Sequence, residues 1–155
     1  MVLTFGFKTP RDLYEKLKRD AAILDSATDL IQQDDAIFNF VITAFHITDW
    51  IKFGPAQSSP EMLKDLEALK KEHSIRLCED LCNASKHFII TRNKSKLSDT
   101  IPYDARVGTA VVGSSRVDQK LPDLDIVDGG NTYSFRDLRD KVMVRYETFF
   151  QDHNL

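Results

Sequence analysis

The stretch DAIFNFVITAFHITDWIKF, residues 35–53, decides the fold, because its apolar side chains occupy nearly every direction around a helical axis. A surface helix needs an apolar stripe on one side only, whereas a helix that is apolar all round needs neighbours on every side. We therefore expect residues 35–53 to form the central, buried helix of a bundle. Its polar side chains then need hydrogen-bond partners on neighbouring elements.

Helix-start signals predict further helices around this central one. The segment 9–12, Thr-Pro-Arg-Asp, combines an N-cap, a proline at the first helical position and an acidic residue that bonds back to the cap. The apolar stripe that follows runs to about residue 33. Ser59-Pro60 repeats the cap and proline, and the helical pattern continues from there to about residue 90, with a break near 71–74.

The period of the pattern changes between residues 101 and 133. Residues 107–112 are short and β-branched, and residues 124–133 alternate around the turn formed by Gly129-Gly130, which is typical of a hairpin. A lone hairpin contributes little stability by itself. We therefore expect the bundle to stay folded without this insertion.

Ser134 is placed to cap a last helix over residues 135–151, whose apolar face consists of Phe135, Leu138, Val142, Tyr146 and Phe149. The sequence thus predicts one domain over residues 1–155 with a mainly α fold. Its architecture is a four- to five-helix bundle, with a small β-hairpin insertion at about 101–133 before the last helix.

Composition restricts the class of protein. The chain has 155 residues, of which 42% are hydrophobic and 29% charged, as in an ordinary globular domain. Its formal charge of −3 excludes a protein that coats nucleic acid through a basic surface. No apolar run approaches the roughly 18 residues of a membrane span, so we expect no membrane association.

The two cysteines indicate the compartment. Cys78 and Cys82 lie one helical turn apart, where a disulfide would strain the helix, and both fall on its apolar arc. We expect two reduced thiols in the core, and therefore a cytoplasmic protein.

Two polar stripes carry the functional signal. The first lies on the central helix and consists of Asn39, Thr43, His46, Asp49 and Trp50. The second lies beyond the 71–74 break, within an arc of about 60° at about 100° per residue, and consists of Arg76, Asp80, Asn83 and His87. If the stripes face each other, two imidazoles, two carboxylates and an amide meet between the helices. This predicts a binding site that includes His46, Asp49 and Asp80.

His87 is the candidate for proton transfer, because imidazole titrates near neutral pH. Lys86 and Arg76 carry charge that neutralises a phosphate, and Asn83 lies one turn before His87, where it is placed to orient the ring. This set suits metal-independent RNA cleavage, in which a base deprotonates the 2′-hydroxyl and cations stabilise the crowded phosphorane. Arg76 and His87 are about 16 Å apart along one helix, so a second helix or subunit has to complete such a site.

Two other interpretations of the stripes stay open. A metal site is the first, because His46, Asp49, Asp80 and His87 are all ligand types. Metal sites in helical bundles usually carry Glu-x-x-His pairs, however, and the chain has none, so we expect no metal and no cofactor. The second interpretation is structural, with Arg76 and Asp80 forming an i,i+4 pair on a solvated face. Trp50 and Phe53 are expected to be core or interface groups in each case.

The sequence Asn83-x-x-Lys86-His87, at the end of a long helix that follows a central one, resembles the HEPN superfamily (higher eukaryotes and prokaryotes nucleotide-binding). The resemblance covers about residues 9–90 and the last helix. It implies a helical bundle that dimerises, in a superfamily that includes toxin and phage-defence ribonucleases and inactive interaction modules. The family's signature places an Arg before the His, with four to six residues between the two. Asp80, Leu81 and Cys82 stand at those places here, so the resemblance carries over His87 alone.

Three functional hypotheses follow. The first is a HEPN-like cytoplasmic module that binds a protein partner, a phosphorylated ligand or RNA without turnover, in a toxin or phage-defence setting and as a homodimer. The second is a metal-independent endoribonuclease that uses His87, with Lys86, Asn83 and Arg76. The third is a structural helical dimer whose polar stripes only specify packing.

Overall fold

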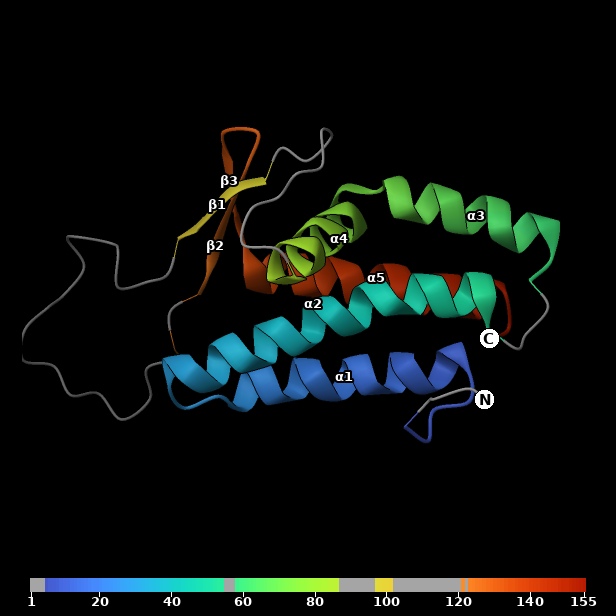
Figure 1. Cartoon of the computed structure of the whole chain (residues 1–155), viewed down its shortest axis with the longest axis horizontal. Helices are drawn as coiled ribbons and strands as arrows, with labels where there is room; N and C mark the ends of the chain where they lie inside the picture. The colour runs from blue at the N-terminus through green and yellow to red at the C-terminus, as the bar shows by residue number, and fades with distance from the viewer. Residues whose placement is uncertain (1–4, 55–57, 87–96, 102–120, 122) are drawn as a thin grey trace, which may run out of the picture.

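The computed structural model describes residues 5–54, 58–86, 97–101, 121 and 123–155, and helices dominate this part of the chain (Figure 1). The helices are α1 (Pro10–Ser26), α2 (Leu30–Phe53), α3 (Pro60–Lys71), α4 (His73–Lys86) and α5 (Phe135–Asp152). The strands are β1 (Leu97–Ile101), β2 (Asp125–Asp128) and β3 (Asn131–Ser134). The mainly α fold with a hairpin before the last helix is confirmed.

Helix α2 is the central element of the bundle. It packs against α1, α3 and α4, and Phe40, Ala44 and Ile47 on it are completely buried. The buried Tyr146 hydroxyl on α5 donates to the carbonyl of Ala44 at 2.5 Å, which joins α5 to the same helix. The predicted burial on every side is wrong, however, because Phe38 is 49% exposed. One side of α2 therefore faces solvent.

The predicted helix starts are confirmed at their N-caps. Thr9 accepts from the backbone N–H of Asp12, whose side chain accepts in turn from the backbone N–H of Thr9. Ser59 caps α3 and Ser134 caps α5 in the same manner, each accepting a hydrogen bond from the third residue after it. These starts are local, because each needs only a four-residue segment to satisfy otherwise unpaired N–H groups.

The boundary between α1 and α2 differs from the prediction. Helix α1 ends at Ser26 rather than near residue 33, and α2 begins at Leu30. Asp29 caps α2, because its carboxylate accepts from the backbone N–H of Gln32 at 2.8 Å and from the side-chain amide of Gln32 at 2.9 Å. An acidic cap followed three residues later by Gln is a helix-start signal, and here it outweighs the apolar stripe that runs through the turn.

The break near 71–74 is confirmed, because α3 ends at Lys71 and α4 begins at His73. The predicted end of this helix near residue 90 lies outside the described residues. The core thiols are confirmed as well: Cys78 and Cys82 are buried and form no disulfide. Burial raises the pKa of the Cys78 thiol, with a smaller contribution from Cys82, so Cys78 is an unreactive core group.

The strands form an antiparallel sheet in the order β1-β2-β3. The predicted hairpin is confirmed: β2 and β3 pair through the turn at Gly129 and Gly130, whose φ angles of 58° and 81° suit glycine. The pairing of β1 with β2 was not predicted; it joins Ile101 to Asp125 and Thr100 to Ile126. The possible strand at 107–112 lies outside the described residues.

The sheet is joined to the bundle rather than appended to it. Ile126 on β2 is completely buried and belongs to the hydrophobic core of the bundle. The carbonyl of Leu124 accepts from the backbone N–H of Phe135 at the start of α5, at 2.9 Å. Because of these contacts, we no longer expect the stability of the helical bundle to be independent of the hairpin.

Two further expectations concern the surface. Trp50 is partly buried and packs against the core, as predicted. Phe53 is 75% exposed and is therefore not a core group, so of the two predicted roles only that of an interface group stays a prediction. None of the helices that the structure describes is long and apolar enough to cross a bilayer.

Candidate functional site

Arg76 links α4 to the sheet through two carboxylates. Its Nη1 donates to Oδ2 of Asp80, one turn along α4, at 3.0 Å, and its Nη2 donates to Oδ2 of Asp128 on β2 at 2.7 Å. Asp80 is only 2% exposed and Asp128 only 4%. The predicted i,i+4 pair is confirmed, but Asp80 does not lie on a solvated face. The guanidinium compensates two buried charges.

His73, the first residue of α4, binds the same carboxylate. Its Nε2 lies 3.0 Å from Oδ2 of Asp128, and its ring lies 4.7 Å from the Tyr133 ring on β3, centroid to centroid. A buried carboxylate on Nε2 and a ring on one side fix the orientation of the imidazole. Nδ1 is the ring nitrogen that this contact leaves available.

Two neighbouring groups lower the pKa of the Asp128 carboxyl. Burial raises the pKa of this carboxyl, but the hydrogen bonds and charges of Arg76 and His73 outweigh burial, so the pKa lies below its usual range. Asp128 is therefore ionised at neutral pH. Both donors bind Oδ2, whereas the other oxygen, Oδ1, is buried and has no hydrogen-bond partner among the described residues.

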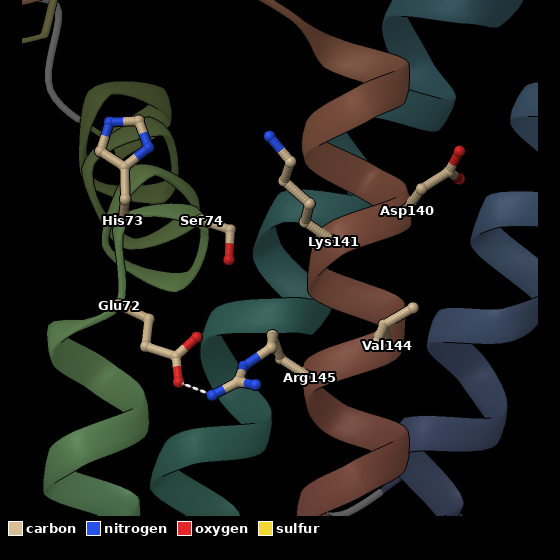
Figure 2. A pocket seen from close by; sticks show the side chains of 7 residues that line it. All are labelled: Glu72, His73, Ser74, Asp140, Lys141, Val144 and Arg145. Carbon is tan, nitrogen blue, oxygen red and sulfur yellow. Dashed lines mark hydrogen bonds and ion pairs between the residues drawn. The ribbon is translucent and has the colours of Figure 1, made fainter.

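His73 stands at one wall of a groove of about 620 Å³ between the start of α4 and the middle of α5, called here the α4–α5 groove (Figure 2). Its lining residues are Glu72, His73, Ser74, Asp140, Lys141, Val144 and Arg145. Figure 2 shows the Lys141 side chain extending from α5 toward His73 and Ser74, while Asp140 points away. A smaller adjoining hollow of about 110 Å³ shares His73, Ser74 and Lys141 and reaches Tyr133.

Ion pairs within the groove leave one cation uncompensated. Glu72 accepts from Arg145 across the groove, as the dashed line in Figure 2 marks, and Asp140 pairs with its neighbour Arg139 at 2.7 Å. Within the described part of the chain, Lys141 has no ion-pair partner. Asp137, one turn before Lys141, lines the adjoining hollow instead.

The start of α4 adds hydrogen-bond donors to the α4–α5 groove, because His73 and Ser74 line it. The first N–H groups of a helix have no acceptor within it. Among the described residues, no side chain accepts from the backbone N–H of His73, Ser74 or Ile75. The groove therefore combines unsatisfied backbone donors, an ammonium group and an oriented imidazole.

The first polar stripe lines a different hollow, of about 340 Å³, between α1, α2 and the segment before α1; it is called here the α1–α2 hollow. Four of the five predicted residues line it, namely Asn39, Thr43, His46 and Trp50. Asp49 is the exception, and it contributes instead to the raised pKa of Tyr146, after burial and Cys78.

The second stripe is only partly described. Arg76 binds Asp128 on β2 and pairs with Asp80, which is buried. Asn83 is half-buried on α4, and Lys86 is the last described residue of that helix. His87 lies outside the described residues. The meeting of the two stripes in one site therefore stays a prediction.

His73 and Asp128 were missed at the sequence level. They are 55 positions apart, and neither belongs to a motif that predicts the other. His73 stands at the predicted break and Asp128 at the start of the predicted glycine turn. The sequence signal that could have pointed to them is that each is a polar residue at a predicted boundary between elements.

The role of His87 has a direct test. The hypotheses that place function at the end of α4 predict that His87→Ala and Lys86→Ala lose growth inhibition, RNA cleavage or ligand binding, because they assign these residues a proton-transfer group and a cation. Circular dichroism checks that both variants fold. Two folded variants that match the wild type in every assay would show that this end of α4 carries no function.

Comparisons with known proteins find no relative. No protein-family model, curated protein or solved structure matches the chain. The geometry of the α4–α5 groove is therefore the basis for inferring a function.

Proposed function

We propose that the protein is a binding module that holds a phosphorylated ligand in the α4–α5 groove. The observation that carries this proposal is the coincidence of Lys141 with the uncapped start of α4. A helix start offers backbone N–H groups and the positive end of the helix dipole, which together favour an anion. A phosphate between His73, Ser74 and Lys141 satisfies these donors.

The chemistry favours binding over turnover. RNA cleavage without a metal needs a base and an acid on opposite sides of the phosphate. Of the three histidines that the structure describes, only His73 lines the groove; His46 lies in the α1–α2 hollow, and His153 pairs with Asp65 at 3.3 Å. The groove thus supplies charge and one imidazole, which suffices for recognition.

The test removes the ammonium group of Lys141. We expect Lys141→Ala to weaken binding of a phosphomonoester such as phosphoserine about tenfold, because one charge-assisted hydrogen bond is lost. Isothermal titration calorimetry measures the affinity. Lys64→Ala is the matched control, since Lys64 is an exposed lysine of α3 outside the groove, and it should bind like the wild type.

A short single-stranded RNA, titrated in parallel, distinguishes a small ligand from a polymer. Tighter binding of RNA than of phosphoserine, still dependent on Lys141, would identify RNA as the ligand. Equal weakening in Lys141→Ala and Lys64→Ala would contradict the proposal, because it would indicate unspecific charge attraction. Absence of binding to both probes would also contradict it.

A further inference from the structure

Among the residues that the structure describes, none lines both the α1–α2 hollow and the α4–α5 groove. Its volume of about 340 Å³ lies at the lower end of the range for small-molecule sites, which begins at roughly 300 Å³. This size suits a molecule of one or two rings. The hollow is therefore a separate place where a ligand can bind.

Lys16 is the lysine that lines the hollow within the described part of the chain, and its charge is already neutralised. Lys16 donates to Oδ2 of the buried Asp20 at 2.6 Å and to the Thr43 hydroxyl at 2.8 Å, and Thr43 donates to the same oxygen at 2.7 Å. The three groups satisfy one another in a closed triangle. An anionic ligand in the hollow would give up its hydration without gaining a free ammonium group, because Asp20 already neutralises Lys16, so an uncharged ligand is favoured over an anionic one.

The walls of the hollow are largely apolar. Phe7 and Trp50 supply aromatic rings, and Leu13 and Ile42 supply aliphatic groups. Flat aromatic molecules pack well against such surfaces, through stacked or edge-on contacts with the rings. The aromatic and aliphatic side chains of the lining therefore favour an aromatic ligand.

Phe5 is the unusual part of the lining, because its side chain is 96% exposed. Its φ angle of 49° is in the left-handed region, and Gly6 follows with a φ of 89°. A phenylalanine in this conformation costs about 1 kcal/mol or more, and its exposed ring gains nothing by packing. A ligand in the hollow would cover the ring and recover apolar burial.

Asn39 gives the hollow a polar edge. Its side chain is exposed at the hollow, and within the described residues its amide makes no hydrogen bond. An amide offers both a donor and an acceptor. A ligand with a hydrogen-bonding substituent therefore gains one or two bonds that a plain hydrocarbon does not.

We infer that the α1–α2 hollow binds a small, uncharged aromatic molecule that carries a hydrogen-bonding group. The ring packs between Phe5, Phe7 and Trp50, and the polar substituent bonds to the Asn39 amide. This binding is independent of the phosphate site proposed for the α4–α5 groove. Variants of Lys141 therefore leave it unchanged.

The experiment uses the chain's single tryptophan as a reporter, because Trp50 gives one indole N–H signal in a ¹H–¹⁵N correlation spectrum. Benzamide is the probe, since it is an uncharged ring with an amide. We expect it to shift the Trp50 signal saturably, and we expect Asn39→Ala to weaken its binding about tenfold. Asp35→Ala, an exposed change on α2 outside the hollow, should bind benzamide like the wild type.

Two related probes test the chemistry of the site. Toluene lacks the polar group and benzoate carries a charge, so both should bind about tenfold more weakly than benzamide. Benzoate binding more tightly than benzamide would overturn the inference of an uncharged ligand. Equal affinity for toluene and benzamide, unchanged in Asn39→Ala, would overturn the role of the amide.

Two results would overturn the site itself. The first is a Trp50 signal that no probe shifts. The second is a dimer in gel filtration that Phe5→Ala dissociates, in the absence of benzamide binding. That result would assign the hollow to a second copy of the chain.

Discussion

Ile126→Ala is expected to lower the free energy of unfolding by about 2 to 5 kcal/mol, which is the usual cost of deleting a fully buried isoleucine side chain from a core. Ile126 is completely buried within the helical core although it belongs to a strand. Truncation leaves a cavity where β2 meets the bundle, because rigid neighbours relax only in part. Chemical denaturation followed by circular dichroism at the helical signal measures the loss.

Thr132→Ala is the matched control for this prediction. Thr132 belongs to the neighbouring strand β3 and is exposed, so its loss should change the free energy of unfolding by less than about 0.5 kcal/mol. If Ile126→Ala unfolds at the same denaturant concentration as Thr132→Ala, the sheet is separable from the bundle. The expectation drawn from the sequence would then be correct.

Asp128→Asn is expected to lower the free energy of unfolding at neutral pH by about 2 to 3 kcal/mol. The change keeps the shape of the side chain but removes the charge that compensates Arg76 and binds His73. Losing one partner of a fully buried pair costs about 3 to 5 kcal/mol. The expected value is smaller because the Arg76 side chain is 27% exposed and water screens part of its charge.

The effect of Asp128→Asn should depend on pH, and its sign follows from the lowered pKa. A carboxyl with a lower pKa in the folded state than in the unfolded state stabilises the protein above its unfolded pKa. This contribution disappears as the pH falls through the folded pKa of Asp128, which lies below its usual range. The difference in stability between wild type and Asp128→Asn should therefore shrink in acid.

Denaturation curves at neutral and acidic pH test this dependence. Asp35→Asn, an exposed change on α2, is the control and should follow the wild type at both pH values. A constant gap between wild type and Asp128→Asn would show that hydrogen-bond acceptance by the Asp128 oxygens, rather than their charge, stabilises the link between α4 and the sheet.

The elements that the sequence predicted correctly depend on short-range interactions. Thr9, Ser59 and Ser134 each cap a helix by accepting from a group three residues away, so a local segment is enough to determine the start. Gly129 and Gly130 likewise determine the hairpin by their own backbone freedom. The one misplaced boundary, at Asp29, was also a local signal, which a continuous apolar stripe concealed.

The first polar stripe shows what periodicity contributes to a site. Asn39, Thr43, His46 and Trp50 lie on one side of α2 and line one hollow, because residues three, four and seven apart share a helical face. The pattern could not show that Lys16, Phe5 and Phe7 complete this hollow. Those residues belong to other segments, and only packing of α1 on α2 brings them there.

The sequence by itself determined the helix starts at Thr9, Ser59 and Ser134, the glycine hairpin and the buried face of α5, because each depends on residues close to one another in the chain. Tertiary structure alone decided that Asp128 meets His73 and Arg76, that Ile126 enters the core, and that Lys141 faces the start of α4. These contacts join residues tens of positions apart in the chain. Their distances are set by how the elements pack, and no local pattern of residues records that packing.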